Sequence, residues 1–556
     1  MNFYYFLHFC HFLCKNLFFF PFITFFSPAM RSFFLFPETR AARARHFVGA
    51  LILASLVFFG RGAQTRAQTN PQSVDWAKVH AVTTEAITEL YSLRYSAAEQ
   101  KCNEVITMAP GDPRGHFFKA MTYFYRYRIS QDKSDYQRFL QLSQNTISVC
   151  ENILKNNPND TKALFYIGGS FGYRGLSRAF GPSEERMKNL MQAVWDGKKG
   201  YDYLNESLKA DPKNADAQMG FGLFNCLIST APSFIKPAIR LAGLTSDRNL
   251  GLRQLESAAA NGIYTRPEAG YWLSVFYAEN EETAPRALWH LKNLLEKYPS
   301  NHWYRITAGS ISLNTLRKPT EAVSYLEPVA SAQTHEKSAQ THEKSAQARA
   351  TRLIGAAALY RLKFAEAAQW FQNCAALKAD SGSFKNALFL QGLMSEIEGN
   401  RAQATQFYRQ SLPYKSSEEL LESPLSSEQI LLRRASFAFR GSEYQEVVRF
   451  AEEVLQRKQL AADLRGSALM LLGRSFAEQG DHTQAEQKFS QVVGLNAEDK
   501  SLLPMAYYRL GVSQAKLGKT SEAKQSFDKA LSYKDYEEED YVKRRVQREA
   551  ARLNKQ

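Results

Sequence analysis

The chain has 556 residues, which is enough for several domains or for one long repeat array. A hydrophobic content of 44% supports packed cores, and an aromatic content of 13% excludes an intrinsically disordered chain. The formal net charge is +15, but six of these excess positive charges lie in residues 1–67, so nine remain in residues 68–556. Both signs are interspersed there, without the dense basic stripe of a nucleic-acid binder, so no nucleic-acid partner is predicted.

The first 67 residues predict a leader rather than folded structure. Residues 1–29 are rich in aromatic side chains and are typical of translated upstream DNA, so we interpret them as a misassigned start. Residues 30–67 have the basic segment, the apolar run and the small residues of a signal peptide. The apolar run, residues 47–60, is shorter than the roughly 20 residues that a spanning helix needs. An uncleaved anchor stays an alternative, because Arg61 and Arg66 lie unusually close to the expected cleavage site.

Residues 68–330 predict a divergent array of paired helices. Apolar residues recur at helical spacing. Prolines close the successive second helices, which is the expected place for a residue that cannot continue a helix. These closing prolines are Pro110, Pro158, Pro212 and Pro299.

An apolar insertion, residues 221–255, interrupts this array. A membrane span is disfavoured, because Lys236 and Arg240 lie inside it and a charge at the bilayer centre costs about 2.5–3.5 kcal/mol. A catalytic site is disfavoured, because its hydroxyl residues have no neighbouring histidine. We predict a packed joint in which one helix ends near Thr230 and Asp247, or Ser246, caps the next. The side chains expected to be buried are Phe221, Leu223, Phe224, Phe234, Ile235, Ile239 and Leu241.

Residues 331–347 contain a duplicated seven-residue unit and predict a polar loop. His335 and His342 lie in this polar segment, so no metal site is predicted there. The cysteines after the leader follow no metal-ligand or disulfide spacing, and we expect them to be small buried residues. They are Cys102, Cys150, Cys226 and Cys374. Neither a metal nor a cofactor is predicted.

Residues 348–536 contain the clearest internal repeat. Two units in succession place leucine, glycine, alanine and phenylalanine at the same spacings, offset by 38 residues. The first unit has Leu469, Leu472, Gly473, Gly480, Ala485, Phe489 and Val492, and the second has Tyr507, Leu510, Gly511, Gly518, Ala523, Phe527 and Ala530.

This pattern resembles the tetratricopeptide repeat (TPR). The resemblance implies that Gly511 lets the second helix approach closely and that Gly518 ends the first helix in a left-handed conformation. We therefore predict an all-α fold, a TPR-type helix-pair solenoid or superhelix, that follows an N-terminal signal segment. The core of such a stack is expected between neighbouring repeats rather than around one centre. Residues 537–556, with an apolar stripe and a basic outer face, predict a capping helix.

A second resemblance covers about residues 215–300. The turn Ser246-Asp247-Arg248 and the helix that follows are similar to a segment of exported bacterial TPR proteins. They are also similar to the outer-mitochondrial-membrane and inclusion-body-clearance TPR family, in which glycine stands in place of Ser246. The resemblance implies a fold and carries over no catalytic residue.

These features predict a noncatalytic, exported TPR scaffold of the periplasm or envelope that binds a protein or peptide partner in a concave groove. The inner face of the outer membrane is one envelope location that fits. A membrane-apposed envelope assembly factor, held by an uncleaved leader or by the segment 232–244, is the alternative, and an enzyme of unrecognised type is the third hypothesis. The arginines among the groove candidates suit an acidic or carboxylate group, although each arginine can equally be solvated or packed between repeats. The groove candidates counted from the repeat glycines are Arg352, Phe389, Arg474 and Tyr508, and the neighbouring Arg509 is added to them.

Overall fold

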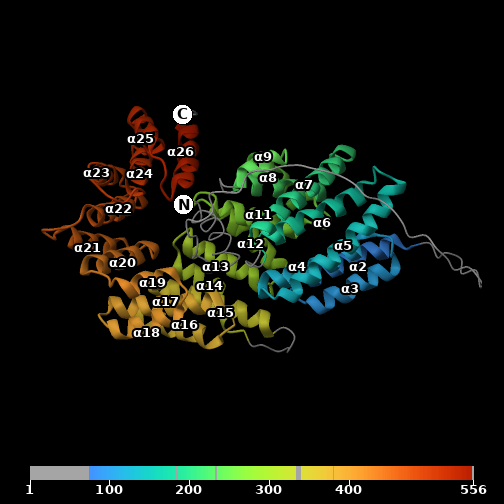
Figure 1. The fold of residues 1–556 in the computed structure, drawn as a ribbon, viewed down its shortest axis with the longest axis horizontal. Helices are drawn as coiled ribbons and strands as arrows, with labels where there is room; N and C mark the ends of the chain where they lie inside the picture. Colours follow the sequence, from blue (N-terminus) through green and yellow to red (C-terminus); the bar gives the residue numbers. More distant parts are fainter. Residues whose placement is uncertain are drawn as a thin grey trace, which may run out of the picture.

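The computed structural model describes residues 74–179, 181, 186–231, 235–332, 340–379 and 381–553. These residues form the helices α2 to α26 and no β-strand, as the all-α prediction requires. Successive helices pack side by side, and the chain winds through two arrays that meet near α14 and α15 (Figure 1). The leader, residues 1–67, lies outside the described residues. No helix in the described part of the chain is both long and apolar enough to cross a membrane.

The helices of the N-terminal array vary widely in length. They are α2 (Trp76–Tyr91), α3 (Tyr95–Met108), α4 (Pro113–Ser130), α5 (Lys133–Asn156), α6 (Thr161–Ala179), α7 (Arg186–Ala210), α8 (Ala215–Ser229), α9 (Lys236–Leu241), α10 (Arg248–Asn261), α11 (Arg266–Tyr277), α12 (Ala284–Lys297), α13 (His302–Asn314) and α14 (Pro319–Ala330).

The C-terminal array continues from α15 to the end of the described chain. Its helices are α15 (Gln340–Tyr360), α16 (Phe364–Leu377), α17 (Ser381–Ile397), α18 (Arg401–Ser411), α19 (Lys415–Glu422), α20 (Ser427–Arg440), α21 (Tyr444–Leu455), α22 (Ala462–Glu478), α23 (His482–Val493), α24 (Leu502–Lys516), α25 (Thr520–Ser532) and α26 (Glu539–Leu553).

The repeat glycines act as the resemblance implies. A Cβ on Gly511 would lie 2.6 Å from the Phe527 ring, and a Cβ on Gly473 would lie 2.6 Å from the Phe489 ring. The two helices of each pair can therefore pack at this distance only because the crossing residue has no side chain. Gly518 ends α24 with a φ of 76°, in the left-handed region, which confirms its predicted role.

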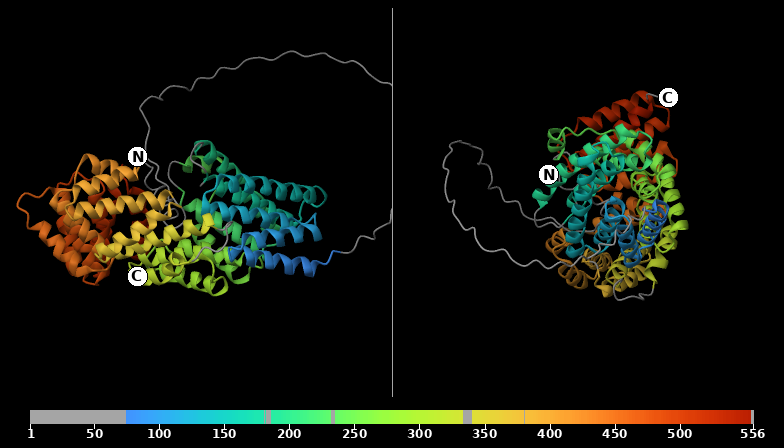
Figure 2. Two further views of the ribbon diagram at one scale, coloured as in Figure 1. Left: turned by 90° about the horizontal axis from the view of Figure 1, so that it is seen from below. Right: turned by 90° about the vertical axis from the view of Figure 1, so that its right-hand side faces the viewer.

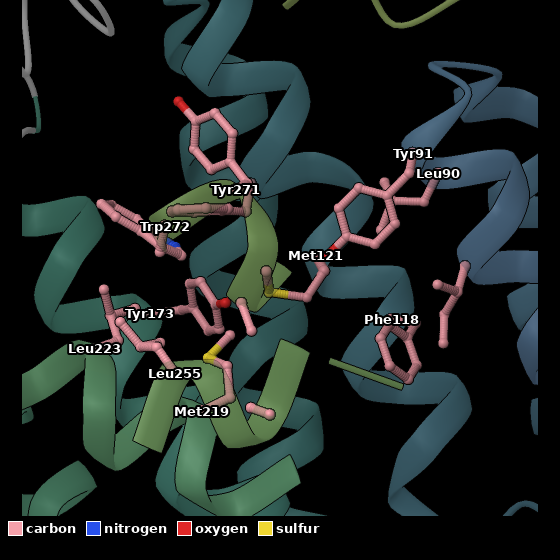
Figure 3. Packing of buried hydrophobic residues seen from close by; sticks show 14 of the residues in the cluster. Leu90, Tyr91, Phe118, Met121, Tyr173, Met219, Leu223, Leu255, Tyr271 and Trp272 are labelled. Carbon is pink, nitrogen blue, oxygen red and sulfur yellow. The ribbon is translucent and has the colours of Figure 1, made fainter. Parts of the chain in front are cut away.

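The N-terminal array winds tightly enough for its first helices to meet its last ones. Asn301 Nδ2 donates a hydrogen bond of 2.7 Å to the carbonyl oxygen of Tyr91, which joins the α12–α13 connection to the end of α2. Seen end on, the helices lie around a central axis (Figure 2). One continuous core extends from Ala86 to Ile311, so the prediction of a core only between neighbouring repeats is wrong for this array. The reason is that large side chains fill its centre (Figure 3): Tyr91, Phe118, Tyr173, Tyr271 and Trp272.

The prediction of a core between neighbours is confirmed for the C-terminal array. Its buried side chains form several smaller clusters, each shared by a few consecutive helices. The first helices of successive pairs, α20, α22, α24 and then α26, contact one another. These first helices form the inner layer of the curve, and α21, α23 and α25 form the outer layer (Figure 1).

The insertion at residues 221–255 is a joint between repeats in the part that the structure describes. α8 ends at Ser229 with Thr230 as its C-cap, and Asp247 Oδ1 accepts a hydrogen bond from the backbone N–H of Leu250, so both predicted boundaries are confirmed. Ile239 is buried, but Leu241 is 82% exposed, which corrects the prediction that both are buried. The six-residue helix α9 has only one face against α7 and α8, and residues two apart lie on opposite sides of a helix. Phe234 lies outside the described residues.

Residues 331–347 differ from the predicted polar loop. α15 begins at Gln340, so the second copy of the duplicated unit enters a helix, and Ser345 is buried at 2% exposure. The side chains of His335 and His342 lie outside the described residues. All four cysteines of the described chain are buried, as predicted.

A carboxylic acid lies inside the core of the N-terminal array. Glu268, on α11, is 2% exposed. Its Oε2 accepts a hydrogen bond of 2.9 Å from the Tyr91 hydroxyl, and its Oε1 accepts one of 2.7 Å from Trp272 Nε1. Burial raises the pKa of Glu268 to about 7, although both hydrogen bonds act in the opposite direction.

The free energy of unfolding should therefore lose a contribution from Glu268 as the pH rises from about 4.5 to about 7. In this window the acid of the unfolded chain releases its proton while the folded one keeps it, so the stabilisation present below this window is lost above it. We expect the urea midpoint of the wild type to fall across this window relative to that of Glu268→Gln. His290, whose pKa burial lowers to about 4, gives an opposite slope in both proteins and cancels in the difference. A difference that does not change with pH would contradict the prediction.

Candidate functional site

A row of arginines lines the inner layer of the C-terminal array. Residues 440, 474, 509 and 545 lie on α20, α22, α24 and α26, at intervals of 34, 35 and 36 residues. We call these four side chains the arginine row. Three members lie near the connections between α11 and α14: Arg545 donates a hydrogen bond to Glu279, and electrostatic interactions link Arg509 to Glu281 and Arg474 to Arg317. Arg440 is exposed and donates a hydrogen bond to Tyr360 on α15.

Within the described residues no member of the row forms an ion pair, and Arg474 and Arg509 also form no hydrogen bond, unlike Arg440 and Arg545. The Arg474 guanidinium lies 4.1 Å from the centre of the Phe439 ring, and the Arg509 guanidinium lies 5.4 Å from the centre of the Tyr508 ring. The Nε atoms of both arginines are buried and make no hydrogen bond. Among the described residues, no carboxylate forms an ion pair with either of them. Both guanidinium groups therefore keep donors available to a planar anionic group.

The electrostatics of the inner face favour a negative charge. Burial and the charges of Arg509 and Arg317 lower the pKa of Arg474 to about 9. Burial acts to raise the pKa of Tyr541, on α26, but the charges of Arg545, Arg509 and Arg474 outweigh burial and lower it. The Arg474 cation is therefore made less stable and an anion at Tyr541 more stable. Burial acts to lower the pKa of Arg509, but the charges of Tyr508, Tyr541, Glu281 and Glu478 outweigh burial and raise it.

Arg317 connects the two arrays beside the row. This residue follows α13, and its guanidinium pairs with Glu281 at 2.8 Å and with Glu478, at the end of α22, at 2.5 Å. The guanidinium also lies 5.1 Å from the centre of the Phe439 ring, the same ring that Arg474 contacts. The Ser442 hydroxyl donates a hydrogen bond of 2.9 Å to the carbonyl oxygen of Arg317. The inner face is therefore built by both arrays.

The sequence-predicted residues lie in two places. Arg474 and Arg509 lie together on the inner face, and Tyr508, at 3% exposure, packs in the core next to Arg509. Arg352 is 7% exposed on α15, with Nη1 3.5 Å from Asn386 Oδ1. Phe389 is half-buried, with its ring centre 4.9 Å from that of Tyr414. The structure shows no contact between the last two residues and the arginine row, and all five remain predictions as binding residues.

Sequence reasoning missed Arg317, Tyr541 and Arg545. The charged run 543–545 suggested a solvated face, but only Lys543 and Arg544 are exposed. Arg545 Nη2 donates a hydrogen bond of 3.1 Å to the carbonyl oxygen of Glu279. The available signal for the row was one arginine on each first helix, at intervals close to but shorter than the 38-residue repeat. No local pattern marks Arg317, because its partners lie in distant parts of the chain.

Catalytic or metal chemistry has no evident centre in the described residues. No group of three His, Cys, Asp or Glu side chains could hold a metal ion there. A cavity of about 280 Å³ lies between α2 and the α10–α11 connection. Its lining contains neither a histidine nor a carboxylate and consists of Thr84, Ile87, Thr88, Gly262, Ile263, Tyr264, Arg266, Pro267, Lys297 and Tyr298.

Comparison with known protein families identifies the repeat in one segment of the chain. Residues 470–539 match the tetratricopeptide repeat family. These residues include Arg474 and Arg509, so two of the four arginines of the row lie within the matched segment. No curated protein matches the sequence. A TPR array of this kind suggests a scaffold for protein–protein interaction.

The solved structures that match this chain do so at low sequence identity and low TM-score. The human IFIT1 dimer with PPP-AAAA is 12% identical with a TM-score of 0.32, covering 76% of this chain and 95% of that one. Yeast Tom70 is 11% identical with a TM-score of 0.24, covering 86% and 96%. The TPR domain of P58(IPK) is 12% identical with a TM-score of 0.19, covering 86% and 98%.

Replacing Arg474 and replacing Arg317 should have different effects on stability. Arg474→Met removes a half-buried cation that has no anionic partner, and methionine can keep a contact with Phe439, so we expect the urea midpoint to stay unchanged or to rise. Arg317→Met leaves Glu281 and Glu478 without their partner and should lower the free energy of unfolding by about 1–3 kcal/mol. Equal losses in the two variants would show that Arg474 is a structural residue.

Proposed function

We propose that this chain is a noncatalytic, exported TPR scaffold that binds an acidic segment of a protein partner on the inner face of its C-terminal array. The observation that carries the proposal is the pair of arginines, Arg474 and Arg509, that have no ionic partner on a surface of positive potential. Guanidinium groups bind carboxylates through paired hydrogen bonds, and each such contact is charge-assisted.

An acidic protein segment suits this surface better than a nucleic acid. The row presents one arginine for each helix pair, and Glu281 and Glu478 lie among the arginines. A polyphosphate backbone would meet these two carboxylates as well, whereas an extended peptide with spaced carboxylates can avoid them. No basic stripe continues over the described chain in the sequence to extend the contact.

Partner capture should depend on the two arginines. The purified chain, used as bait in an extract of its own cell envelope, should retain its partner. Arg474→Ala with Arg509→Ala should weaken that capture at least tenfold at unchanged melting temperature, and Lys524→Ala, an exposed cation of the outer helix α25, is the matched control. An equal loss of binding and of stability, or no loss of binding, would contradict the proposal. Capture that is abolished by nuclease treatment would assign a nucleic acid instead.

A membrane-apposed envelope assembly factor is the second candidate function. The observation that favours it is the apolar side chain of Leu241, which is 82% exposed on α9 beside the exposed cations Lys236 and Arg240. An apolar residue flanked by cations is typical of a helix that lies on an anionic lipid surface.

Localisation tests separate the two functions. An exported and cleaved chain should begin near Gln68, which N-terminal sequencing of the cellular protein measures. It should be released by osmotic shock, because nothing but the leader would hold it. A chain that stays in the membrane fraction, and leaves that fraction when Leu241 is changed to serine, would favour the assembly factor.

A further inference from the structure

The inner face is in contact with an acidic segment of the same chain. The α11–α12 connection contains the run Glu-Asn-Glu-Glu at residues 279–282, which we call the acidic loop. Three arginines of the C-terminal helix hold this loop from a distance of more than 260 residues in sequence. Arg545 donates to the Glu279 carbonyl oxygen, Arg548 donates to Asn280 Oδ1, and Arg552 donates to Glu282 Oε1 at 2.7 Å.

The charges of the loop and of the arginine row are complementary. Burial acts to raise the pKa of Glu281, but its hydrogen bond to Arg317 and the charges of Arg317, Arg509 and Arg545 outweigh burial and lower that pKa. The Glu281 carboxylate is therefore stabilised by the same positive surface that we assign to an acidic partner. The acidic loop of the same chain therefore shows that this surface stabilises a carboxylate.

The acidic loop does not pair with all of the arginines on the inner face. Its carboxylates pair with Arg317 and Arg552, and none of them forms an ion pair with Arg474 or Arg509. The ion pair of Glu282 with Arg552 is exposed on both sides, at 54% and 44%, and such pairs contribute little to stability. An acidic segment that also reaches Arg474 and Arg509 would gain charge-assisted hydrogen bonds that the loop does not make.

The contact between these three arginines and the acidic loop does not depend on the packing of α26. Val542, Val546 and Leu553 are buried on one face of the helix against α24 and α25. Arg545, Arg548 and Arg552 follow one another at intervals of three and four residues, so they share another face. The contact with the loop can therefore be lost while the helix stays packed.

We propose that the acidic loop is an internal occupant of the inner face, which an acidic partner segment displaces when it binds. This inference rests on the proposed function, because it requires that the inner face is the binding surface. The loop lowers the affinity of the inner face for weakly acidic segments. A segment that also reaches Arg474 and Arg509 binds in preference to those weakly acidic segments.

Binding of the loop sequence in trans tests this inference. The probe is a fluorescent peptide with the sequence of residues 277–284, YAENEETA, and its fluorescence anisotropy is titrated with the full mature chain. Glu281→Gln with Glu282→Gln should bind the peptide at least fivefold more tightly than the wild type, because the internal competitor is weakened. Arg552→Ala should also increase the affinity, because it releases the loop from the opposite side without changing the loop.

Matched controls keep the outcomes distinct. Glu522→Gln removes an exposed carboxylate from the outer helix α25 and should leave the affinity unchanged. Melting temperatures of all variants, measured in the same buffer, show whether a changed affinity comes from a changed fold. Arg474→Ala with Arg509→Ala, added to the loop-neutralised variant, should remove the gain in affinity.

The results separate the two proposals. If the loop-neutralised variant and Arg552→Ala bind the peptide no better than the wild type, while Arg474→Ala with Arg509→Ala reduces binding, internal occupancy is overturned and the binding surface stands. If the arginine substitutions leave peptide binding unchanged, the proposed function falls as well. A single-stranded RNA that binds the chain and is not displaced by the peptide would also overturn both.

Discussion

The bifurcated ion pair of Arg317 is the contact on which the arrangement of the two arrays depends. Its guanidinium reaches Glu281 in the N-terminal array and Glu478 in the C-terminal array, and its carbonyl oxygen accepts a hydrogen bond from Ser442. These contacts join segments that are up to about 200 residues apart, and they hold the α13–α14 connection against the ends of α20 and α22. The inner face exists as a shared surface because this contact brings the acidic loop opposite α22, α24 and α26.

The two arrays bury their apolar side chains in different ways. In the N-terminal array, large aromatic side chains lie in one core that holds together helices far apart in sequence. In the C-terminal array, alanine and glycine lie where helices cross, and the core divides into clusters between neighbours. The inner surface of the second array is lined by long polar side chains instead. A rigid first half and an accessible second half follow from this difference in residue size.

The sequence predicted the features that local spacing determines. The distance of sixteen residues between Gly511 and Phe527 specified the crossing of α24 and α25, and Asp247 specified the start of α10, because each interaction is completed within one helix pair. The exposure of Leu241 was not predictable, because the face that a six-residue helix buries depends on its neighbours. For the candidate site, the repeat register indicated Arg474 and Arg509. It could not indicate Arg317 or the acidic loop, because their contacts depend on how tightly the whole array curves.

The spacing of the arginine row has a consequence for which feature of a partner the inner face would recognise. Packed helices lie about 8–10 Å apart, and an extended chain rises about 3.3 Å per residue, so every third residue of an extended partner would reach a new arginine. Such a surface would recognise the spacing of acidic residues in the partner rather than a particular sequence. Because the four arginines stand at different positions along their helices, a partner shifted by one helix pair would meet a different set of charges, so the registers would differ in energy. The ends of the row, where Arg440 donates a hydrogen bond to Tyr360 and Arg545 contacts the acidic loop, would then decide which register is retained.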